Sequence, residues 1–504
     1  MLTAFACYLA GVIILGLAAH RYLSRGSFLK DYFIGNRGLG AWVLATSFAA
    51  TAISGGTFMG FPALIYTHGW VLALWIAGYM TVPLVTMAVL GKRINQVSRI
   101  SGAVTIPDIL RDRFESPGIG LLTSVILVFF LGWNLVAQFK AGGLLMSEAS
   151  RDILERWDLF QASDTTFLGA MTGEPPAYVL GLVVFVFMVV AYTAYGGFWG
   201  VTLTDVLEGL VMLFGAVTLA ILALWKVGGL QAATRELLRQ DPALVYGPGP
   251  SNFLPFGIAV SFFFQWTIIG MGQPGALVRL MAFRDSRALK RAICVCAFYY
   301  AITYVSLVVV FICARALYPL DSGPRPDEIM PFMVRKLASP VSNVLAGFLL
   351  AAPYAAIMST VAAYLLIVSS SLVRDVYQRF VNPLAAPSTI RRLSYAVTIA
   401  VGAAAFIGAL HPPEFLQNII VFSTEGLGVS LLAPIFLGLY WRRMTREGAL
   451  CGMAAGLLTH LALHALGFKP LLASLGLSFL LAWLVSLATA PSSPRVLERY
   501  FFRP

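Results

Sequence analysis

Thirteen stretches of this chain are apolar and long enough to cross a lipid bilayer. They begin near residues 3, 39, 70, 118, 176, 201, 254, 291, 341, 393, 414, 447 and 470. A hydrocarbon layer about 30 Å thick requires about 20 largely apolar residues for each helical crossing. The composition agrees, since 59% of the residues are hydrophobic and only 12% are charged. The sequence therefore predicts an all-α polytopic membrane protein with thirteen transmembrane helices and no soluble domain at either end.

Basic residues collect in short segments that follow alternate apolar stretches. The segments 21–37, 92–113, 279–291, 374–392, 442–446 and 495–503 hold most of the 35 lysines and arginines. Cytoplasmic loops are enriched in Lys and Arg, so we expect the N-terminus outside and the C-terminus in the cytoplasm. Topology thus accounts for the net charge of +12, and no nucleic acid is expected as a partner. We expect a multi-pass protein of the cell (inner) membrane, surrounded by lipid and without an obligate protein partner.

Two of the apolar stretches contain clusters of residues that weaken a helix. The first is "TAISGGTFMGFP", Thr51 to Pro62, and the second is "IIGMGQPG", Ile268 to Gly275. Glycine, proline and hydroxyl side chains interrupt helical hydrogen bonding or compete with it. Freed backbone groups find no water in hydrocarbon, so such breaks are expected to line a cavity or to bind a ligand. The alternative is that the glycines only allow close helix packing.

The positions of the two breaks indicate an internal repeat. Each broken span is followed by four further spans, which gives two five-helix halves at 39–253 and 254–443. An odd number of spans per half inverts the second copy, as in inverted-repeat transporters whose site lies between two broken helices. Residues 1–38 then form an extra helix and loop, and 444–504 form two further helices and a tail. The segments Ser147–Pro176 and Val227–Asn252 are long enough for short surface helices, and "GGLQAATRELLRQ" has the periodicity of one.

Five motifs of the chain, taken together, resemble the sodium:solute symporter family. They occur in the order "DYFIGNRGLGAWVLATSFAATAISGGTFMGFPALIYTHG", "AYTAYGGFWGVTLTDVLEGLVM", "GMGQPGALVRLMAFRD", "AAIMSTVAAYLLIVSSSLVRDVY" and "APIFLGLYWRR". Within the family, "FLLAAPYAAIMST" and "HPPEFLQNII" are most similar to the sodium/pantothenate branch, with the proline branch next. The resemblance implies a LeuT-type five-plus-five inverted-repeat core and sodium-driven uptake by alternating access.

The resemblance also implies a sodium site between the first break and the span from residue 341. Its ligands would be the carbonyls of Ala50, Ile53 and Ala356 and the hydroxyls of Ser359 and Thr360. Sodium prefers hard oxygen ligands, and unwound helices offer carbonyls without a partner. The alternative for the two hydroxyls is a bond to their own helix carbonyls.

Asp205 in "TLTDVLEG" is an ionisable residue within a span, where such residues are costly and usually functional. The family has an aspartate here, so we interpret Asp205 as an electrostatic aid to sodium binding or release. A helix cap or an ion pair with an arginine is the alternative. The proline branch has another aspartate two residues before the serine of the first motif, where this chain has Ala52.

Polar and aromatic residues around the breaks are candidates for binding substrate. The first break offers open backbone and hydroxyls, Trp266 matches an aromatic position of the proline branch, and Asn418 matches a polar position of a sugar branch. Asn134 and Gln138 are one turn apart and share a helix face. Each alone is better explained as a helix–helix contact, and only together do they indicate a polar lining. The candidates are Ser54, Gly55, Gly56, Thr57, Asn134, Gln138, Lys140, Trp266, Gln273 and Asn418.

Two charged residues within spans, Lys140 and Glu425, lie outside the general family pattern. Lys140 has three alternative roles: receiving a substrate carboxylate, pairing with Glu425, or extending toward the membrane surface. His460 and His464 are four residues apart, but they lie outside the repeat and are interpreted as packing residues.

These observations favour a sodium-coupled symporter for a small organic solute, with sodium as the coupling ion and pantothenate as the leading carboxylate substrate. The alternatives are another monocarboxylate or an amino acid such as proline. A membrane-embedded enzyme is disfavoured, because clustered catalytic residues such as HExxH are absent from the sequence. A channel does not need matched broken helices, and a sodium-sensing receptor needs a signalling module.

Overall fold

The computed structural model describes residues 1–19, 32–156, 174–411 and 416–502. In these ranges the regular structure is helical, apart from an isolated parallel bridge between Leu39 and Phe283. The basic residues expected in the loop at 21–30, part of the segment Ser147–Pro176, and four residues of the motif "HPPEF" lie outside them.

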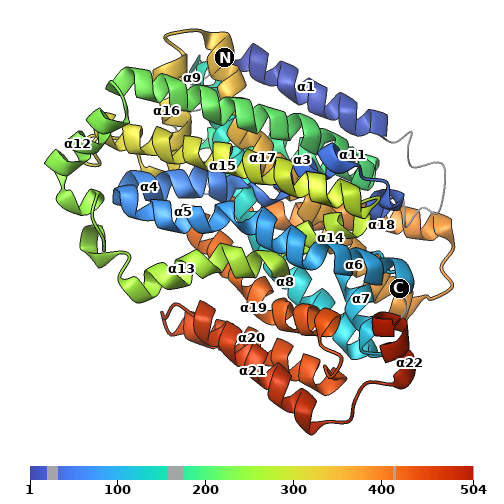
Figure 1. The fold of residues 1–504 in the computed structure, drawn as a ribbon. Coiled ribbons are helices and arrows are strands. Elements are labelled where there is room, and N and C mark those ends of the chain that lie inside the picture. The colour runs from blue at the N-terminus through green and yellow to red at the C-terminus, as the bar shows by residue number, and fades with distance from the viewer. Residues whose placement is uncertain (20–31, 157–173, 412–415, 503–504) are drawn as a thin grey trace.

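The helices follow the predicted apolar stretches closely (Figure 1). Those before the chain midpoint are α1 (Leu2–Ala18), α3 (Ala41–Ala52), α4 (Phe61–His68), α5 (Leu72–Met80), α6 (Ala88–Ser101), α7 (Ile106–Arg113), α8 (Pro117–Ala149), α9 (Arg151–Arg156), α11 (Pro176–Val227) and α12 (Leu230–Gln240). The later ones are α13 (Phe256–Ile269), α14 (Pro274–Ala282), α15 (Ser286–Leu317), α16 (Ile329–Ala338), α17 (Asn343–Ser370), α18 (Pro387–Leu410), α19 (Leu416–Tyr440), α20 (Arg446–Ala465), α21 (Leu471–Ala488) and α22 (Pro494–Leu497).

Within the described residues, nine helices are long and apolar enough to cross a membrane, or eleven when each bent pair counts as one span. One of these, α11, covers two predicted spans in 52 residues. It is interrupted at Gly197, whose φ of 56° is a conformation that favours glycine and whose Cβ would lie 2.5 Å from the Tyr32 ring. The 17-residue α1 is a further short apolar helix. The total of thirteen spans therefore stays a prediction.

Both predicted breaks are present in the structure. The chain bends by 58° between α3 and the helical segment Gly56–Val71. It bends by 47° between the segment Phe256–Gly272, which contains α13, and α14. At the first break Ile53 is extended, with ψ of 114°, and at the second Gln273 is extended, with ψ of 118°. Pro274 then begins α14 at a position where a missing N–H costs nothing.

The arrangement of helices puts the breaks at the centre of the molecule. The buried helix α17 packs on α11, α8 and α3, and α19 packs on α8. Outside this core, α1 runs along one edge against α11 and α17, while α20 and α21 lie side by side at the opposite edge (Figure 1). The predicted surface helix in Val227–Asn252 is confirmed as α12.

Candidate functional site

The first break brings backbone carbonyls against hydroxyls of α17. Ser359 Oγ donates to the carbonyl of Ala50 at 2.8 Å and lies 3.1 Å from that of Ala356. All three residues are fully buried. Ile53 ends α3 in an extended conformation, so its carbonyl is released from helical bonding and turns toward α17.

Thr360 completes this cluster of oxygens. Its Oγ1 lies 3.3 Å from the carbonyls of Thr51 and Ile53 and 3.0 Å from that of Ala356. A hydroxyl has one hydrogen, so it cannot satisfy three carbonyls at once. The surplus of buried hard oxygens, without any nitrogen in the cluster, is the donor set that suits an alkali cation. The structure thus brings together five of the six residues expected at the sodium site and adds the carbonyl of Thr51. The sixth, Asp205, contacts Ser47 and Arg279 instead.

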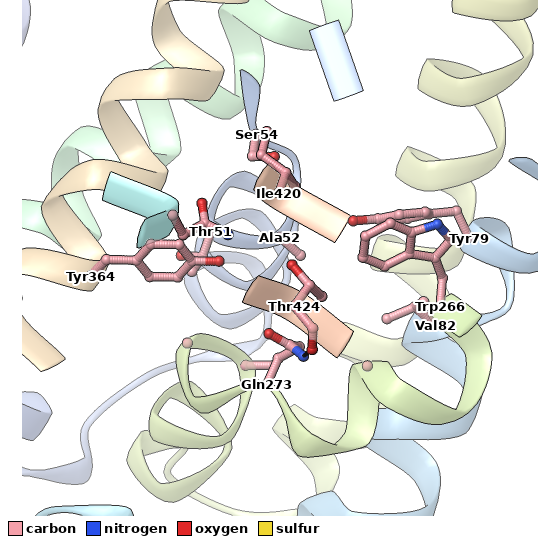
Figure 2. Close-up of a pocket in the computed structure, with 14 residues that line it drawn as sticks. Thr51, Ala52, Ser54, Tyr79, Val82, Trp266, Gln273, Tyr364, Ile420 and Thr424 are labelled. Carbon is pink, nitrogen blue, oxygen red and sulfur yellow. Dashed lines mark hydrogen bonds between the residues drawn. The ribbon is translucent and has the colours of Figure 1, made fainter. Parts of the chain in front are cut away.

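A cavity lies beside this cluster, between the two broken helices (Figure 2). Figure 2 shows Tyr79 and Trp266 on one side and Tyr364 on the other, with Gln273 and Thr424 between them. Its described lining contains hydroxyls, amides and aromatic rings but no charged side chain. The lining residues are Thr51, Ala52, Ser54, Tyr79, Val82, Asn134, Trp266, Gly270, Gln273, Gly275, Ala276, Tyr364, Ile420 and Thr424.

Some residues of the first break line the cavity, and others contact the neighbouring helices. Ser54 lines the cavity, while its Oγ accepts the N–H of Gly56 at 3.1 Å. Gly55 donates its N–H to Gln138 Oε1 at 2.9 Å, and Thr57 Oγ1 lies 3.2 Å from the Tyr304 hydroxyl. The glycines and Thr57 therefore face neighbouring helices, outside the cavity lining.

Asn134 and Gln138 share one face of α8, as predicted, and form a chain of hydrogen bonds that leads to the first break. Gln138 Nε2 donates to Asn134 Oδ1 at 3.1 Å, and Asn134 Nδ2 donates to Ser423 Oγ of α19 at 2.8 Å. Asn134 also lines the cavity. Gln138 is fully buried and holds the freed N–H of Gly55, so its contacts are those of a positioning residue.

The second break contributes two of the candidate residues, Trp266 and Gln273, to the cavity lining. The Gln273 amide donates to the Thr424 carbonyl at 3.0 Å and so connects the break to α19. The indole N–H of Trp266 is buried and has no hydrogen-bond partner among the described residues. A bound ligand with an acceptor group would satisfy it.

Asn418 is exposed and does not line the cavity, unlike Ile420 and Thr424 of the same helix. Its neighbour Gln417 is buried, and the two polar atoms of its side chain lack a partner among the described residues. A Cβ added at Gly60 would lie 1.9 Å from Gln417 Oε1, so this amide sits directly against the broken helix. Sequence reasoning missed Gln417, Thr424, Tyr79 and Tyr364.

Asp205 forms a buried ion pair. Its Oδ2 lies 2.9 Å from Arg279 Nη2 of α14 and accepts a hydrogen bond from Ser47 Oγ of α3 at 2.5 Å. Arg279 Nε also donates to the carbonyl of Ser47 at 3.1 Å. This is the arginine pairing considered as the alternative for Asp205, and it connects α11 to both broken helices.

Glu208, one turn after Asp205, is a second acid within the same apolar helix. It is fully buried, and neither carboxylate oxygen has a hydrogen-bond partner among the described residues. Sequence reasoning missed it, although a second acid in an apolar span was itself a signal of function.

Lys140 and Glu425 each interact electrostatically with a group of opposite charge. Burial raises the pKa of Asp327, in the connection between α15 and α16, and the positive charge of Lys140 acts against that shift. The cation that acts on the buried Glu425 is Lys469, between α20 and α21. The pairing of Lys140 with Glu425, one of the three roles considered for Lys140, stays a hypothesis. Lys140 is also absent from the cavity lining.

His460 packs as interpreted from the sequence. Its ring stacks on Phe422, and Nε2 lies 3.0 Å from the Phe422 carbonyl. No group of three or more His, Cys, Asp or Glu side chains suited to a metal occurs in the part of the chain that the structure describes.

Comparison with known proteins agrees with this geometry. The profile of the Sodium:solute symporter family matches residues 32–151 and 166–456. The sodium/pantothenate symporter of Escherichia coli (strain K12) is 33% identical over 97% of this chain and 96% of its own. An osmoregulated proline transporter of Bacillus subtilis (strain 168) is 28% identical over 90% of this chain and 86% of its own.

A solved structure of a Na⁺-coupled sialic acid symporter, in a substrate-bound outward-open state, has the same fold. Its TM-score is 0.75 over 97% of this chain and 98% of its own, at 20% identity. The two bent helices and the match of nearly full length show a LeuT-type inverted-repeat fold, as the sequence predicted.

The chain belongs to the sodium:solute symporter family. It is a sodium-coupled membrane transporter of a small solute and not an enzyme, which agrees with the interpretation of the sequence.

Proposed function

We propose that this protein imports pantothenate, or a closely similar carboxylate, together with sodium. One observation carries the proposal: the stretch Thr51–Ser54 belongs both to the oxygen cluster and to the cavity lining. A cation bound by the carbonyls of Thr51 and Ile53 lies beside any solute in the cavity. Each ligand then stabilises the conformation of the break that the other needs, which is the requirement for coupled transport.

The described lining of the cavity has no charged side chain, so an anionic solute is favoured there only when sodium is present. No lysine or arginine is among the described residues that line it. A carboxylate in a site of low dielectric needs a nearby positive charge, which the co-transported sodium ion supplies. The hydroxyls and amides of Ser54, Asn134 and Thr424 suit the hydroxyl and amide groups that pantothenate carries.

Relatives favour pantothenate over proline. The pantothenate symporter of Escherichia coli is the more similar of the two relatives, at 33% against 28% identity. By the resemblance of the first motif, the proline branch has an aspartate where this chain has Ala52. Ala52 lines the cavity with a methyl group, so a proline-type carboxylate is missing there.

The proposed site assigns sodium to Ala50, Ile53, Ala356, Ser359 and Thr360, and it assigns the substrate to Ser54, Asn134, Trp266 and Gln273. Asp205 acts on the site through its ion pair with Arg279. The two repeats are 39–253 and 254–443, and the protein lies in the inner membrane with its N-terminus outside and its C-terminus in the cytoplasm.

Uptake by proteoliposomes tests the proposal. We expect labelled pantothenate to accumulate against its gradient when sodium is outside, and not when potassium replaces sodium. Unlabelled pantothenate should compete, whereas proline should not. Sodium-dependent uptake of proline without uptake of pantothenate would assign the protein to the other branch, and uptake independent of sodium would overturn the coupling.

A further inference from the structure

A basic groove lies on the outside of the bundle, where α3 and α15 begin. It has a volume of about 920 Å³ and shares no described lining residue with the central cavity. Trp42 lines it from α3, and Arg287, Lys290 and Arg291 line it from α15. None of these residues has a role in the sodium cluster or the substrate cavity.

The backbone fixes the two sides of this groove relative to each other. Leu39 donates its N–H to the Ala282 carbonyl at 3.1 Å, and Arg284 donates its N–H to the Leu39 carbonyl at 3.0 Å. These two bonds join the residues that precede α3 to those that precede α15, and the two helices then pack together. Backbone hydrogen bonds therefore hold the two sides of the groove in place, including the short connection between α14 and α15 that carries Arg284.

The charge in the groove is strongly positive. Its one acid, Asp285, already accepts the N–H of Ala288 at 2.8 Å as a helix cap and pairs with Arg284 at 3.0 Å. Arg287, Lys290 and Arg291 are exposed, and no acidic side chain within the described ranges pairs with them. A concave surface with three unpaired cations attracts an anion.

The surface of α15 changes from basic to apolar about two to four turns beyond Arg291. Phe298 is 72% exposed, Ile302 45% and Val305 51%, and they continue the helix face of Arg291 and Cys294 at spacings of three and four residues. Trp42 is 72% exposed at the basic end. Indole rings favour the boundary between headgroups and hydrocarbon. A basic end, an aromatic residue at the boundary and an apolar stripe match the order of groups in a phospholipid.

From this arrangement we infer that the groove binds an anionic phospholipid such as phosphatidylglycerol. Arg287, Lys290 and Arg291 contact its phosphate, Trp42 lies at the ester level, and an acyl chain follows Phe298 and Ile302. Basic residues next to the membrane favour anionic headgroups, and basic recesses between helices bind them specifically. A free phosphate would use the cations but would gain nothing from the apolar stripe.

Native mass spectrometry of the full-length protein in detergent tests this assignment. We expect Arg287→Gln/Arg291→Gln to weaken phosphatidylglycerol binding about 30-fold, which corresponds to about 2 kcal/mol at 1.4 kcal/mol per tenfold. The matched control is Arg391→Gln/Arg392→Gln at the start of α18, which removes two exposed cations away from the groove and should leave binding unchanged.

A second measurement places the acyl chain. Phosphatidylglycerol with brominated chains should quench tryptophan fluorescence, and Trp42→Phe should remove part of that quenching. Equal binding of phosphatidylcholine, equal loss in the control pair, or displacement of the lipid by inorganic phosphate at the same concentration would overturn the assignment. Unchanged quenching in Trp42→Phe would do so as well.

Discussion

The hydroxyl of Ser359 donates to the carbonyl of Ala50 at 2.8 Å, which joins the first broken helix to α17 across 309 positions of the chain. Ala50 belongs to the first half of the sequence and Ser359 to the second. A conformational change that separates the two halves must therefore break this contact or replace it. An ion held by oxygens of both halves couples its own binding to that motion.

Ser359→Ala and Thr360→Ala should each weaken sodium binding. Losing one hydroxyl ligand to a charged partner costs about 1.5–3 kcal/mol, or about 10–150-fold in apparent sodium affinity. Because coupling between sites is reciprocal, substrate affinity should fall at low sodium and recover as sodium saturates. Uptake across a series of sodium concentrations measures both effects.

The control for this series is Ser370→Ala, on the same helix. Ser370 is also buried, but its hydroxyl donates only to the Ile367 carbonyl of its own helix, at 2.8 Å. It should keep the half-saturating sodium concentration of the parent protein. If the variants at 359 and 360 keep it too, the sodium site lies elsewhere.

Gln138→Leu should destabilise the first break. The change leaves the buried N–H of Gly55 without its acceptor, at a cost of about 1–3 kcal/mol. Gln138→Glu keeps an acceptor and should cost less. Gln265→Leu is the matched control, since Gln265 is buried but its amide lacks a partner within the described residues. Denaturation in detergent micelles measures the stabilities, and equal effects of the two Leu variants would contradict a positioning role for Gln138.

The two breaks were predictable from the sequence because the residues that interrupt a helix are local. Pro274 lacks a backbone N–H, and the first bend falls at the extended Ile53, directly before Gly55 and Gly56, so both bends lie where the sequence places helix-weakening residues. Gly55 keeps helical angles, and Gln138 Oε1 occupies the space that its missing Cβ leaves. The oxygen cluster proposed to bind sodium was predictable only through resemblance. No spacing rule brings Ser359 to Ala50, because their contact depends on how α17 packs against α3.

The cavity lining was harder to predict because it depends on the rotation of each helix. Successive helical residues are about 100° apart, so Asn418 lies about 200° from Ile420 and points away from the cavity. Gln417, Ile420 and Thr424 share the inward face at spacings of three and four. A small error in the assumed rotation of α19 is therefore enough to choose Asn418 as the inward-facing residue in place of Gln417.

Ala52→Asp tests the charge of the transported solute. Ala52 lines the cavity, so a carboxylate there would repel an anionic substrate and, at the same time, lie beside the sodium cluster. We expect pantothenate uptake to fall far more in Ala52→Asp than in the nearly isosteric Ala52→Asn. Uptake at saturating sodium separates repulsion of the substrate from effects on the ion. An equal loss in both variants would indicate that volume, and not charge, governs this position.

Removing either partner of the Asp205–Arg279 pair should be strongly destabilising. Both side chains are buried, and the loss of one leaves an uncompensated charge, which costs about 3–5 kcal/mol. The double variant Asp205→Asn/Arg279→Gln should lose less than the sum of the two single variants, because neither charge is then left alone. Denaturation in detergent gives the coupling energy. Additive losses would show that the pair contributes no mutual stabilisation.

Accessibility of introduced cysteines tests the orientation of the protein. The background for this experiment replaces the exposed Cys7, Cys294 and Cys451, so that only the new thiol reacts. Gly247 and Ser286 are exposed positions on either side of the second broken helix, and no atom lies within 4 Å of a Cβ added at Gly247.

Gly247→Cys should react with an impermeant maleimide added to intact cells, and Ser286→Cys only after the membrane is opened. Both expectations follow from the basic residues near Ser286, because Lys and Arg are enriched in cytoplasmic segments. The opposite labelling pattern would reverse the orientation of both termini and, with it, the membrane face on which the basic groove at α15 lies.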